Sequence, residues 1–265
     1  MHPVLFEIWG RDFHTYGMAF ALSILLGVIL TTRRAKREGL DEQTMLNALL
    51  FAIIGVVVMS KVTHIAVTWD WYMRDPHRFL NLRVGHVFYG GYFGAVLFPF
   101  VYARFIAKIP YVPMVDTATP YMGLGLALHR AFGCMSAGCC HGSPTDVPWA
   151  VEFPPGAPAF EEFGSLAVHP TQYYEAMLGL VIFVALVYWR GNRRKVYGEL
   201  LVLQVALYAV GRFIIEFFRG DSARGLWGPL STSQWISIAM LVAAGVGVLF
   251  VARARKRQSA AAAAT

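Results

Sequence analysis

Seven long stretches of apolar residues, separated by short polar segments, run along the 265-residue chain. They cover approximately residues 13–32, 46–68, 86–107, 112–133, 172–189, 197–218 and 233–252. Hydrocarbon about 30 Å thick needs roughly 20 apolar residues to be crossed as a helix. Inside lipid, a helix satisfies its backbone groups within its own segment. The pattern therefore predicts an all-α polytopic membrane protein with about seven transmembrane helices.

The composition agrees with this prediction. Hydrophobic residues make up 57% of the chain, charged residues only 15%, and the mean hydropathy is +0.50, which is unlike an ordinary soluble domain. Residues 1–12 lack a basic segment, and no small-residue cleavage site follows the first apolar stretch, so we expect the first span to be retained. We expect a single membrane domain over residues 1–253, followed by a flexible cytoplasmic tail at 254–265.

Basic residues are distributed unevenly between the two sets of loops. One set contains fourteen: Arg33, Arg34, Lys36, Arg37, Arg104, Lys108, Arg190, Arg193, Arg194, Lys195, Arg253, Arg255, Lys256 and Arg257. The other set contains Arg11, Arg74, Arg78, Arg83, Arg219 and Arg224. Since cytoplasmic loops carry the excess of Lys and Arg, this predicts an N-terminus outside and a cytoplasmic C-terminus. Topology and contacts with anionic lipid then explain the net charge of +7, and we expect no nucleic-acid partner.

The longest connection, 134–171, is predicted to be extracytoplasmic. It is rich in proline and contains four acidic residues but no Lys or Arg. A connection of this length is usually functional or disordered. Its aromatic residues indicate that it packs against something: Trp149, Phe153, Phe160 and Phe163.

Three basic residues lie inside the predicted spans: Lys61, Arg130 and Arg212. Each costs roughly 2.5–3.5 kcal/mol at the centre of a bilayer unless it is paired or hydrated. Glu216 follows Arg212 by one helical turn, which predicts an ion pair, whereas Lys61 and Arg130 could instead extend to the headgroups. Several guanidinium groups near the outer boundary predict an anion pocket, and a phospholipid headgroup is its most available occupant.

The three cysteines of the chain crowd together in a glycine-rich segment. They are Cys134, Cys139 and Cys140. Their spacing lacks the paired C-x-x-C units of a zinc site, so packing or a structural disulfide is favoured over a metal. We expect no metal and no cofactor. The neighbouring Gly142 indicates a sharp turn or a close approach of the backbone.

Four polar strings lie where predicted spans begin or end: 14–17, 86–91, 169–175 and 208–219. Tyrosine at such depths is often only an interface anchor. The third string is more informative, because His169, Gln172 and Glu175 bring an imidazole, an amide and a carboxylate to the point where a helix enters the bilayer.

Taken together, these strings resemble the prolipoprotein diacylglyceryl transferase family of bacteria, from about His14 to Ile238. The most specific pieces are 169–175, 211–219 and 88–91. The resemblance implies transfer of the diacylglyceryl group of phosphatidylglycerol to the lipobox cysteine of a preprolipoprotein. The products would be a thioether and glycerol phosphate. It further implies that phosphatidylglycerol, preprolipoprotein signal peptides and the bilayer are the partners, and that the protein resides in the bacterial cytoplasmic (inner) membrane.

The resemblance also implies roles for particular residues. Expected catalytic residues are Arg212, Arg130, Tyr208, Tyr89 and His86. Expected substrate-binding residues are Tyr16, His14, Lys61, Gly90, Gly91, Gly142, His169, Gln172, Glu175, Glu216 and Arg219. A thiol of pKa near ~8.5 must lose its proton, and arginine suits a departing phosphate because it is bidentate and permanently charged.

The sequence departs from the family pattern at four places, one of which is the replacement of the asparagines and glutamate of the glycine-rich signature by Cys134, Ala137 and Cys139. Arg130 lies three residues before Gly133, where the family places its arginine two residues before, and one residue turns a helical side chain by about 100°. Tyr89 stands in place of a histidine, and Lys61 in place of an arginine. The proton acceptor is therefore left open among His86, Tyr89 and His141.

Two other classes of function stay open. One is a non-catalytic or transport protein that holds an anionic lipid at the same arginines, although no convincing internal repeat supports a transporter. The other is a family relative with a different acceptor, or with a thiol-redox role for its cysteines.

Overall fold

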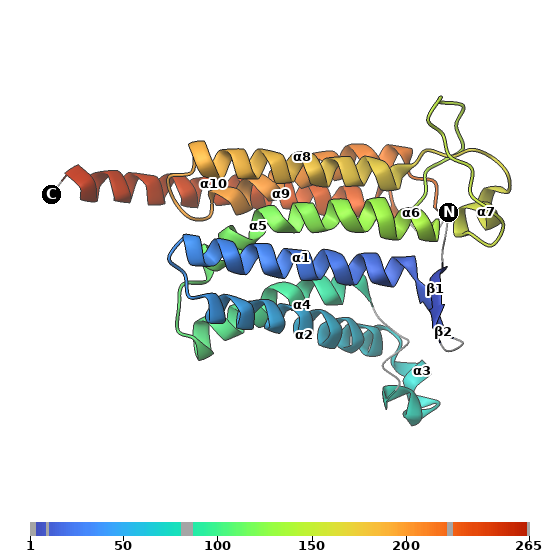
Figure 1. The fold of residues 1–265 in the computed structure, drawn as a ribbon, viewed down its shortest axis with the longest axis horizontal. Coiled ribbons are helices and arrows are strands. Elements are labelled where there is room, and N and C mark those ends of the chain that lie inside the picture. The colour runs from blue at the N-terminus through green and yellow to red at the C-terminus, as the bar shows by residue number, and fades with distance from the viewer. Residues whose placement is uncertain (1–3, 9–10, 81–86, 222–224, 264–265) are drawn as a thin grey trace. The chain divides into compact units, whose positions relative to one another are not determined.

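A computed structural model describes residues 4–8, 11–80, 87–221 and 225–263 of the chain. Within these residues, all seven predicted apolar segments are helical (Figure 1). The long helices are α1 (Thr15–Arg37), α2 (Glu42–Val67), α4 (Phe88–Val101), α5 (Tyr111–Leu128), α8 (Thr171–Asn192), α9 (Glu199–Ile215) and α10 (Thr232–Ala263).

Shorter elements extend or connect these helices. The π-helical turns η2 (Tyr102–Ile106) and η3 (His129–Cys134) continue α4 and α5, and the 3-10 turn η4 (Glu216–Phe218) continues α9. The connections hold α3 (Trp69–Met73), the 3-10 turn η1 (Pro76–Leu80), α6 (Met135–Ala137) and α7 (Pro158–Phe163). Two antiparallel pairs complete the structure: β1 (Val4–Ile8) with β2 (Arg11–His14), and β3 (Leu226–Trp227) with β4 (Leu230–Ser231).

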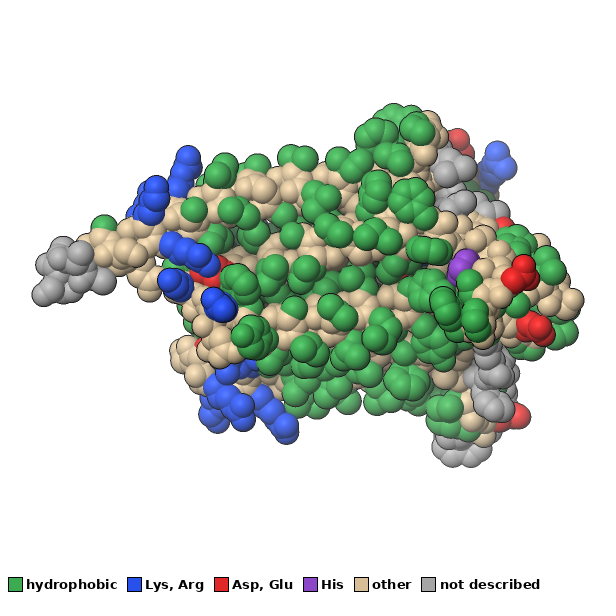
Figure 2. All heavy atoms as spheres, turned by 90° about the horizontal axis from the view of Figure 1, so that it is seen from above, with side chains coloured by type: hydrophobic (Ala, Val, Ile, Leu, Met, Phe, Trp, Pro, Cys, Tyr) green, Lys and Arg blue, Asp and Glu red, His purple; other side chains and the backbone are tan. Residues whose placement is uncertain are grey.

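Among the described residues, five helices are long and apolar enough to cross a membrane. They are Thr15–Arg37, Glu42–Val67, Thr171–Asn192, Glu199–Phe218 and Thr232–Ala260, and Gly90–Ile106 is a shorter apolar helix. Many large hydrophobic side chains on these helices are exposed, and Figure 2 shows them covering much of the visible face. Exposure on this scale indicates contact with lipid, so the chain is a helical, polytopic membrane protein.

The chain divides into two compact units where the sequence predicted one domain. The larger unit contains Met1–Leu30 and Val115–Thr265, and the smaller unit contains Thr31–Met114. Each unit has its own buried core.

In the smaller unit, glycines let helices α2 and α4 touch backbone to backbone. A Cβ at Gly94 would lie 1.9 Å from the carbonyl oxygen of Gly55, and a Cβ at Gly55 would lie 2.2 Å from the carbonyl oxygen of Gly94. A Cβ at Gly90 would lie 2.3 Å from Thr63 Oγ1. Small residues at such crossings allow close packing in membranes. The core at the other end of this unit consists of Ala35, Met45, Ala48, Tyr102, Ala103 and Met114.

In the larger unit, α5 and α8 cross at Gly123 and Gly179, where a Cβ on Gly179 would lie 2.7 Å from the carbonyl oxygen of Gly123. Asp116, on α5, is fully buried and accepts hydrogen bonds from the backbone N–H groups of Leu200 (2.9 Å) and Leu201 (3.1 Å). A carboxylate thus satisfies the otherwise unpaired N–H groups at the start of α9.

The basic segment 190–196 and the end of α10 lie at the same end of the larger unit. Arg255 on α10 pairs with Glu199 at 2.9 Å, and Glu199 accepts the backbone N–H groups of Lys195 and Val196. The topology prediction requires these two basic segments to lie on the same side of the membrane. Residues from 254 onward, expected to form a flexible tail, continue α10 as helix to Ala263.

The long connection 134–171 packs on itself. Met135, Phe153, Ala159 and Val168 form a small core that Phe160 and Phe163 cover. Backbone hydrogen bonds of 3.0 Å join Val151 and Val168 in both directions. Its aromatic residues therefore do pack, mainly against the connection's own core, whereas Trp149 is exposed and donates to the hydroxyl of Tyr174 at 2.7 Å.

The glycine contact in the smaller unit generates a first prediction. We expect Gly94→Ala to destabilise the protein by about 1–3 kcal/mol, because the added methyl group would displace α2 from α4. This exceeds the gain of up to about 1 kcal/mol in helix propensity. The melting temperature in detergent should fall by about 2–4 °C for each kcal/mol. The control is Gly27→Ala, because nothing lies within 4 Å of its Cβ position. Equal melting temperatures for the two variants would contradict the packing role.

Candidate functional site

A buried carboxylate lies at the centre of the site in the larger unit. Glu175, in the second turn of α8, has a side chain that is 1% exposed. Its carboxylate oxygens lie 2.8 Å from Arg130 Nε, 3.5 Å from Arg212 Nη1 and 3.6 Å from Arg219 Nη1. Three guanidinium groups from three separate elements thus converge on one anion.

Two further carboxylates complete this arginine cluster. Arg212 pairs with Glu216 at 2.7 Å across one turn of α9 and η4, which confirms the predicted ion pair. Arg219 forms a two-bond contact with Asp221 through Nε (2.6 Å) and Nη2. Burial opposes the charge of Arg219, but the hydrogen bonds and charge of Asp221 hold the pKa of Arg219 above its ordinary value. Opposite charges in equal number allow such a group to be buried.

Arg212 also connects the cluster to α10. Its Nη2 donates to Ser233 Oγ at 3.0 Å. The Nη1 atom is buried, and among the described residues it finds no hydrogen-bond partner, although it lies 3.5 Å from Glu175. A buried donor of this kind can take a further acceptor oxygen, such as one from a bound phosphate.

Arg130 is positioned by a π-helical turn. The turn η3 covers His129–Cys134 directly after α5, and Arg130 is its second residue. Such turns usually occur as single bulges within α-helices and are frequent at functional sites. From this turn Arg130 reaches Glu175, although it lies three residues before Gly133 where the family resemblance implies two.

Gly142 lies where three backbone segments meet. Its N–H donates to the carbonyl oxygen of His169 at 2.9 Å, and the next residue, Ser143, donates to the carbonyl oxygen of Phe218 at the same distance. A Cβ at Gly142 would lie 2.4 Å from His169 Cβ and 2.7 Å from the Phe218 oxygen. The predicted close approach is present, and only glycine fits it.

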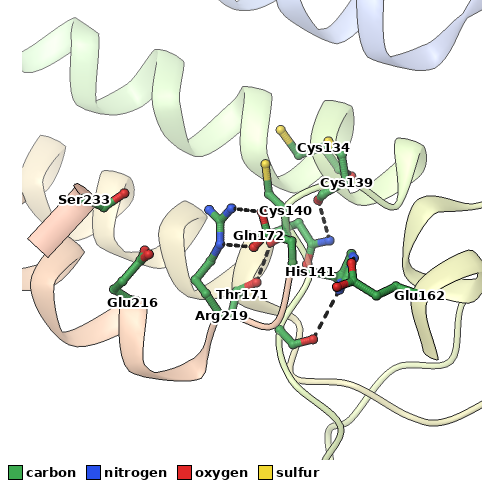
Figure 3. Close-up of polar contacts among 12 residues, drawn as sticks. Cys134, Cys139, Cys140, His141, Glu162, Thr171, Gln172, Glu216, Arg219 and Ser233 are labelled. Atoms are coloured by element: carbon green, nitrogen blue, oxygen red, sulfur yellow. Dashed lines mark hydrogen bonds and ion pairs between the residues drawn. The ribbon is translucent and has the colours of Figure 1, made fainter. Parts of the chain in front are cut away.

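Two buried side chains at the start of α8 hold the cysteine turn. Thr171 Oγ1 donates to the carbonyl oxygen of Cys140 at 2.6 Å, and Gln172 Nε2 donates to that of Cys139 at 2.9 Å (Figure 3). Both side chains are fully buried. The same helix that carries Glu175 therefore fixes the turn that follows Arg130.

An apolar groove adjoins this region. Its volume is about 530 Å³, and it is lined by α1, by Leu5 of β1, and by Leu128 and Phe132, which lie two residues on either side of Arg130. Small-molecule sites are typically of about 300–1,000 Å³ and mostly apolar. The groove matches a hydrocarbon chain in character.

Comparison with known proteins identifies the family. The model of the family described as prolipoprotein diacylglyceryl transferase matches residues 3–251. The chain is 34% identical over 259 residues to the phosphatidylglycerol–prolipoprotein diacylglyceryl transferase of Clostridium tetani, covering 97% of this chain and 100% of that protein. It is 31% identical to the protein of the same name from Finegoldia magna, covering 97% of each chain, and 30% identical to that of Clostridioides difficile, covering 97% of this chain and 98% of the relative. The chain belongs to the prolipoprotein diacylglyceryl transferase family.

Of the residues that the family resemblance implies, the larger unit brings several together. The cluster contains Arg130, Arg212, Arg219, Glu175 and Glu216, and the neighbouring turn contains Gln172 and Gly142. Arg130 contributes to this grouping from the π turn that follows α5.

The remaining residues of the larger unit lie around the cluster. His169 forms part of the scaffold, with Nδ1 3.1 Å from the hydroxyl of Tyr174. Tyr208 packs against the apolar core of α8 and α9. Tyr16, on α1, is 43% exposed and meets the ring of His129 edge-on with centroids 4.9 Å apart. His14 is exposed at the end of β2.

The other predicted residues belong to the smaller unit. Lys61 is buried, with its ammonium group 5.0 Å from the centre of the Tyr72 ring. Gly90 packs against α2, and a Cβ at Gly91 would lie 3.3 Å from Val56. Tyr89 is the second residue of α4, but its side chain is outside the described part of the structure, and His86 lies wholly outside it.

Sequence reasoning missed three contributors: Asp221, Ser233 and Thr171. A signal existed for Asp221, because a carboxylate two residues after Arg219 can reach the same guanidinium. Ser233 and Thr171 make contacts to segments far away in the sequence, which no local pattern indicates.

The central carboxylate generates a second prediction. We expect Glu175→Gln to destabilise the protein by about 3–5 kcal/mol, because it leaves buried guanidinium groups without their shared counter-charge. Thermal unfolding in detergent measures the loss. The matched control is Glu162→Gln, whose side chain is 26% exposed and pairs with His141.

A double variant tests whether the loss arises from the charge. Arg130→Gln combined with Glu175→Gln should cost less than the sum of the two single changes, since residues in one ion-pair network are not additive. Strict additivity would indicate that Arg130 and Glu175 act independently.

Proposed function

We propose that this chain transfers the diacylglyceryl group of phosphatidylglycerol to the lipobox cysteine thiol of preprolipoproteins. The observation that carries the proposal is the convergence of three arginines on Glu175 in a member of this family. The relatives are named for this reaction, and they match this chain over nearly its full length.

The reaction requires charge to move from sulfur to phosphate. The acceptor thiol loses its proton, and the thiolate attacks the glyceryl carbon that carries the phosphate oxygen. A carbon–sulfur bond forms while the carbon–oxygen bond breaks, and glycerol phosphate leaves with the electron pair. The phosphate gains one negative charge as the sulfur loses its charge, so guanidinium groups that face the phosphate bind the transition state more strongly than the ground state.

Roles follow from the contacts in the cluster. We assign phosphate binding to Arg212 and Arg130, with Nη1 of Arg212 as the donor that is available for a substrate oxygen. Glu175 and Glu216 are positioning residues, because both contact arginines of the cluster. Arg219 is also a positioning residue, because it contacts Glu175. The proposed acceptor of the thiol proton is one of His86, Tyr89 and His141, and we assign a supporting role to Tyr208.

The remaining predicted residues are proposed to surround the two substrates. Gln172, His169 and Gly142 hold the turn beside the cluster. Tyr16 and His14 lie on the N-terminal side of α1, and in the smaller unit Lys61, Gly90 and Gly91 are proposed to contribute to the signal-peptide or lipid site. We propose that the apolar groove along α1 accepts an acyl chain of the lipid.

The membrane arrangement is proposed on the same basis. The proposal is seven spans, from the seven apolar stretches, with an external N-terminus and a cytoplasmic C-terminus, from the distribution of basic residues. The cluster and the connection 134–171 then face the outer side of the bacterial inner membrane. Signal peptides of secreted precursors expose their lipobox cysteine there.

The decisive test uses purified enzyme, phosphatidylglycerol and a lipobox peptide, with the mass of the peptide as the readout. We expect the wild type to add a diacylglyceryl group, and Arg212→Ala to lower kcat/KM by about 10²–10³, the loss typical for one donor to a developing charge. Arg253→Ala, an exposed arginine on α10, is the control. Full activity in Arg212→Ala would overturn the mechanism.

The rival functions give different results in the same experiments. A transport protein would move anions across proteoliposomes without lipid turnover, and it would not complement a strain depleted of the transferase. A relative with another acceptor would consume phosphatidylglycerol only when that acceptor replaces the lipobox peptide.

The groove generates a further prediction. We expect Leu22→Trp to raise KM for long-chain phosphatidylglycerol by about tenfold, because filling the groove removes roughly 1–3 kcal/mol of apolar contact. KM for a short-chain lipid should change little. The control is Leu249→Trp, an exposed position on α10. An equal effect on both lipids would show that the groove does not hold an acyl chain.

A further inference from the structure

The three cysteines form a sulfur cluster that the proposed reaction does not use. The sulfur atoms of Cys134, Cys139 and Cys140 all lie within 4.8 Å of one another, and all three thiols are free. Cys134 is buried, and the other two are partly buried. Figure 3 shows the three cysteine side chains close to one another, with Gln172 beside them.

The backbone is strained at this turn. Cys140 has a φ of +60°, one of only two positive values among the described residues other than glycine. A left-handed conformation is unfavourable for a residue with a Cβ and persists only where the surroundings enforce it. Here the surroundings are the hydrogen bonds from Thr171 and Gln172 to the carbonyl oxygens of Cys140 and Cys139. Fully buried side chains thus hold the turn in a shape that gathers the sulfur atoms.

The arrangement favours three equivalent ligands over one disulfide. A disulfide would join two sulfur atoms and leave the third, whereas each of these sulfur atoms lies near both others. Zn–S bonds of about 2.3 Å place tetrahedral ligands about 3.8 Å apart, which falls within the observed limit. An imidazole nitrogen also adjoins the group, since His129 Nε2 lies 3.5 Å from Cys134 Sγ.

The neighbouring charge suits a site made of thiolates. Arg130 Nη1 lies 3.6 Å from Cys134 Sγ. A different nitrogen of the same guanidinium, Nε, contacts Glu175. Three thiolates around a divalent or monovalent ion carry a net negative charge, and a guanidinium at this distance attracts that charge while it also pairs with Glu175. Soft thiolate ligands select zinc or Cu(I) over hard cations.

We propose that Cys134, Cys139 and Cys140 bind one thiophilic d¹⁰ metal ion, zinc or Cu(I), that fixes the turn beside Arg130. Binding displaces the three thiol protons to solvent, and no electron is transferred. The role is structural, because the ion would fasten the end of η3 to the turn that Thr171 and Gln172 hold. The spacing of the cysteines in the sequence pointed away from a metal, since it lacks paired units, but the fold supplies the proximity that the spacing does not.

The test measures metal directly in the full-length protein, purified in detergent under reducing conditions and without chelator. Elemental analysis should find about one zinc or copper ion per chain, and the identity of the element distinguishes the two ions. The variant with all three cysteines changed to serine should contain at least tenfold less. Ser136→Ala, in the same turn but without a thiol change, is the control and should keep the metal.

A second measurement covers the case in which the triple variant does not fold. Wild-type protein is stripped with a chelator and titrated with Co(II), which should produce a sulfur-to-metal charge-transfer band that saturates at about one equivalent. Because the chain has only three cysteines, alkylation counts the cluster directly. All three thiols should be protected by metal and reactive after chelation.

Two results would overturn the proposal. One is wild-type protein that contains no metal and gives no charge-transfer band. The other is a chain whose mass is lower by two hydrogens and in which only one thiol can be alkylated. That result would show a disulfide between the other two cysteines. The Arg212→Ala variant separates this proposal from the proposed function, since it should bind metal as the wild type does. Metal without lipid transfer in the wild type would contradict only the transferase.

Discussion

Burial of a carboxylate among guanidinium groups is the constraint that the rest of the larger unit satisfies. Each of these charges would cost several kcal/mol alone in a low-dielectric setting, so Arg130, Arg212 and Arg219 must all reach Glu175 at once. This requirement fixes the rotation of α8 and α9, the course of the chain after η4 and the shape of the turn after α5. The fold around the site follows from an electrostatic condition as much as from apolar packing.

The same cluster shows how an anion can be bound without a large excess of positive charge. Three arginines face Glu175, Glu216 and Asp221, so the formal charges cancel. A phosphate would therefore share donors with carboxylates that are already in place. Such an arrangement holds the guanidinium groups in one orientation before substrate arrives, and pre-oriented donors need no reorganisation when charge develops. The carboxylates thus hold the guanidinium groups in place, while the arginines attract the phosphate.

The sequence predicted the elements of the fold well because apolar length is a local property. All seven apolar segments are helical, and the pair Arg212 and Glu216 follows from a spacing of one turn. Contacts between distant segments were not predictable in this way. Asp116 stabilises the start of α9 from a different helix. Gly90 was assigned to substrate, yet it also lies against α2. Such roles depend on which helices meet, which no single segment encodes.

The position of Arg130 shows why register alone was misleading. On a regular α-helix, a shift of one residue would turn this side chain by about 100° from the direction that the family resemblance implies. In the structure Arg130 lies in a π turn after α5, and its guanidinium reaches Glu175. π turns are rare and occur mostly as single bulges in α-helices, frequently at functional sites. Thr171 and Gln172 on α8 hold the cysteine turn, which follows η3 after the short helix α6. Contacts between distant segments therefore place Arg130 and the turn that follows it, and the position of Arg130 in the sequence does not reveal them.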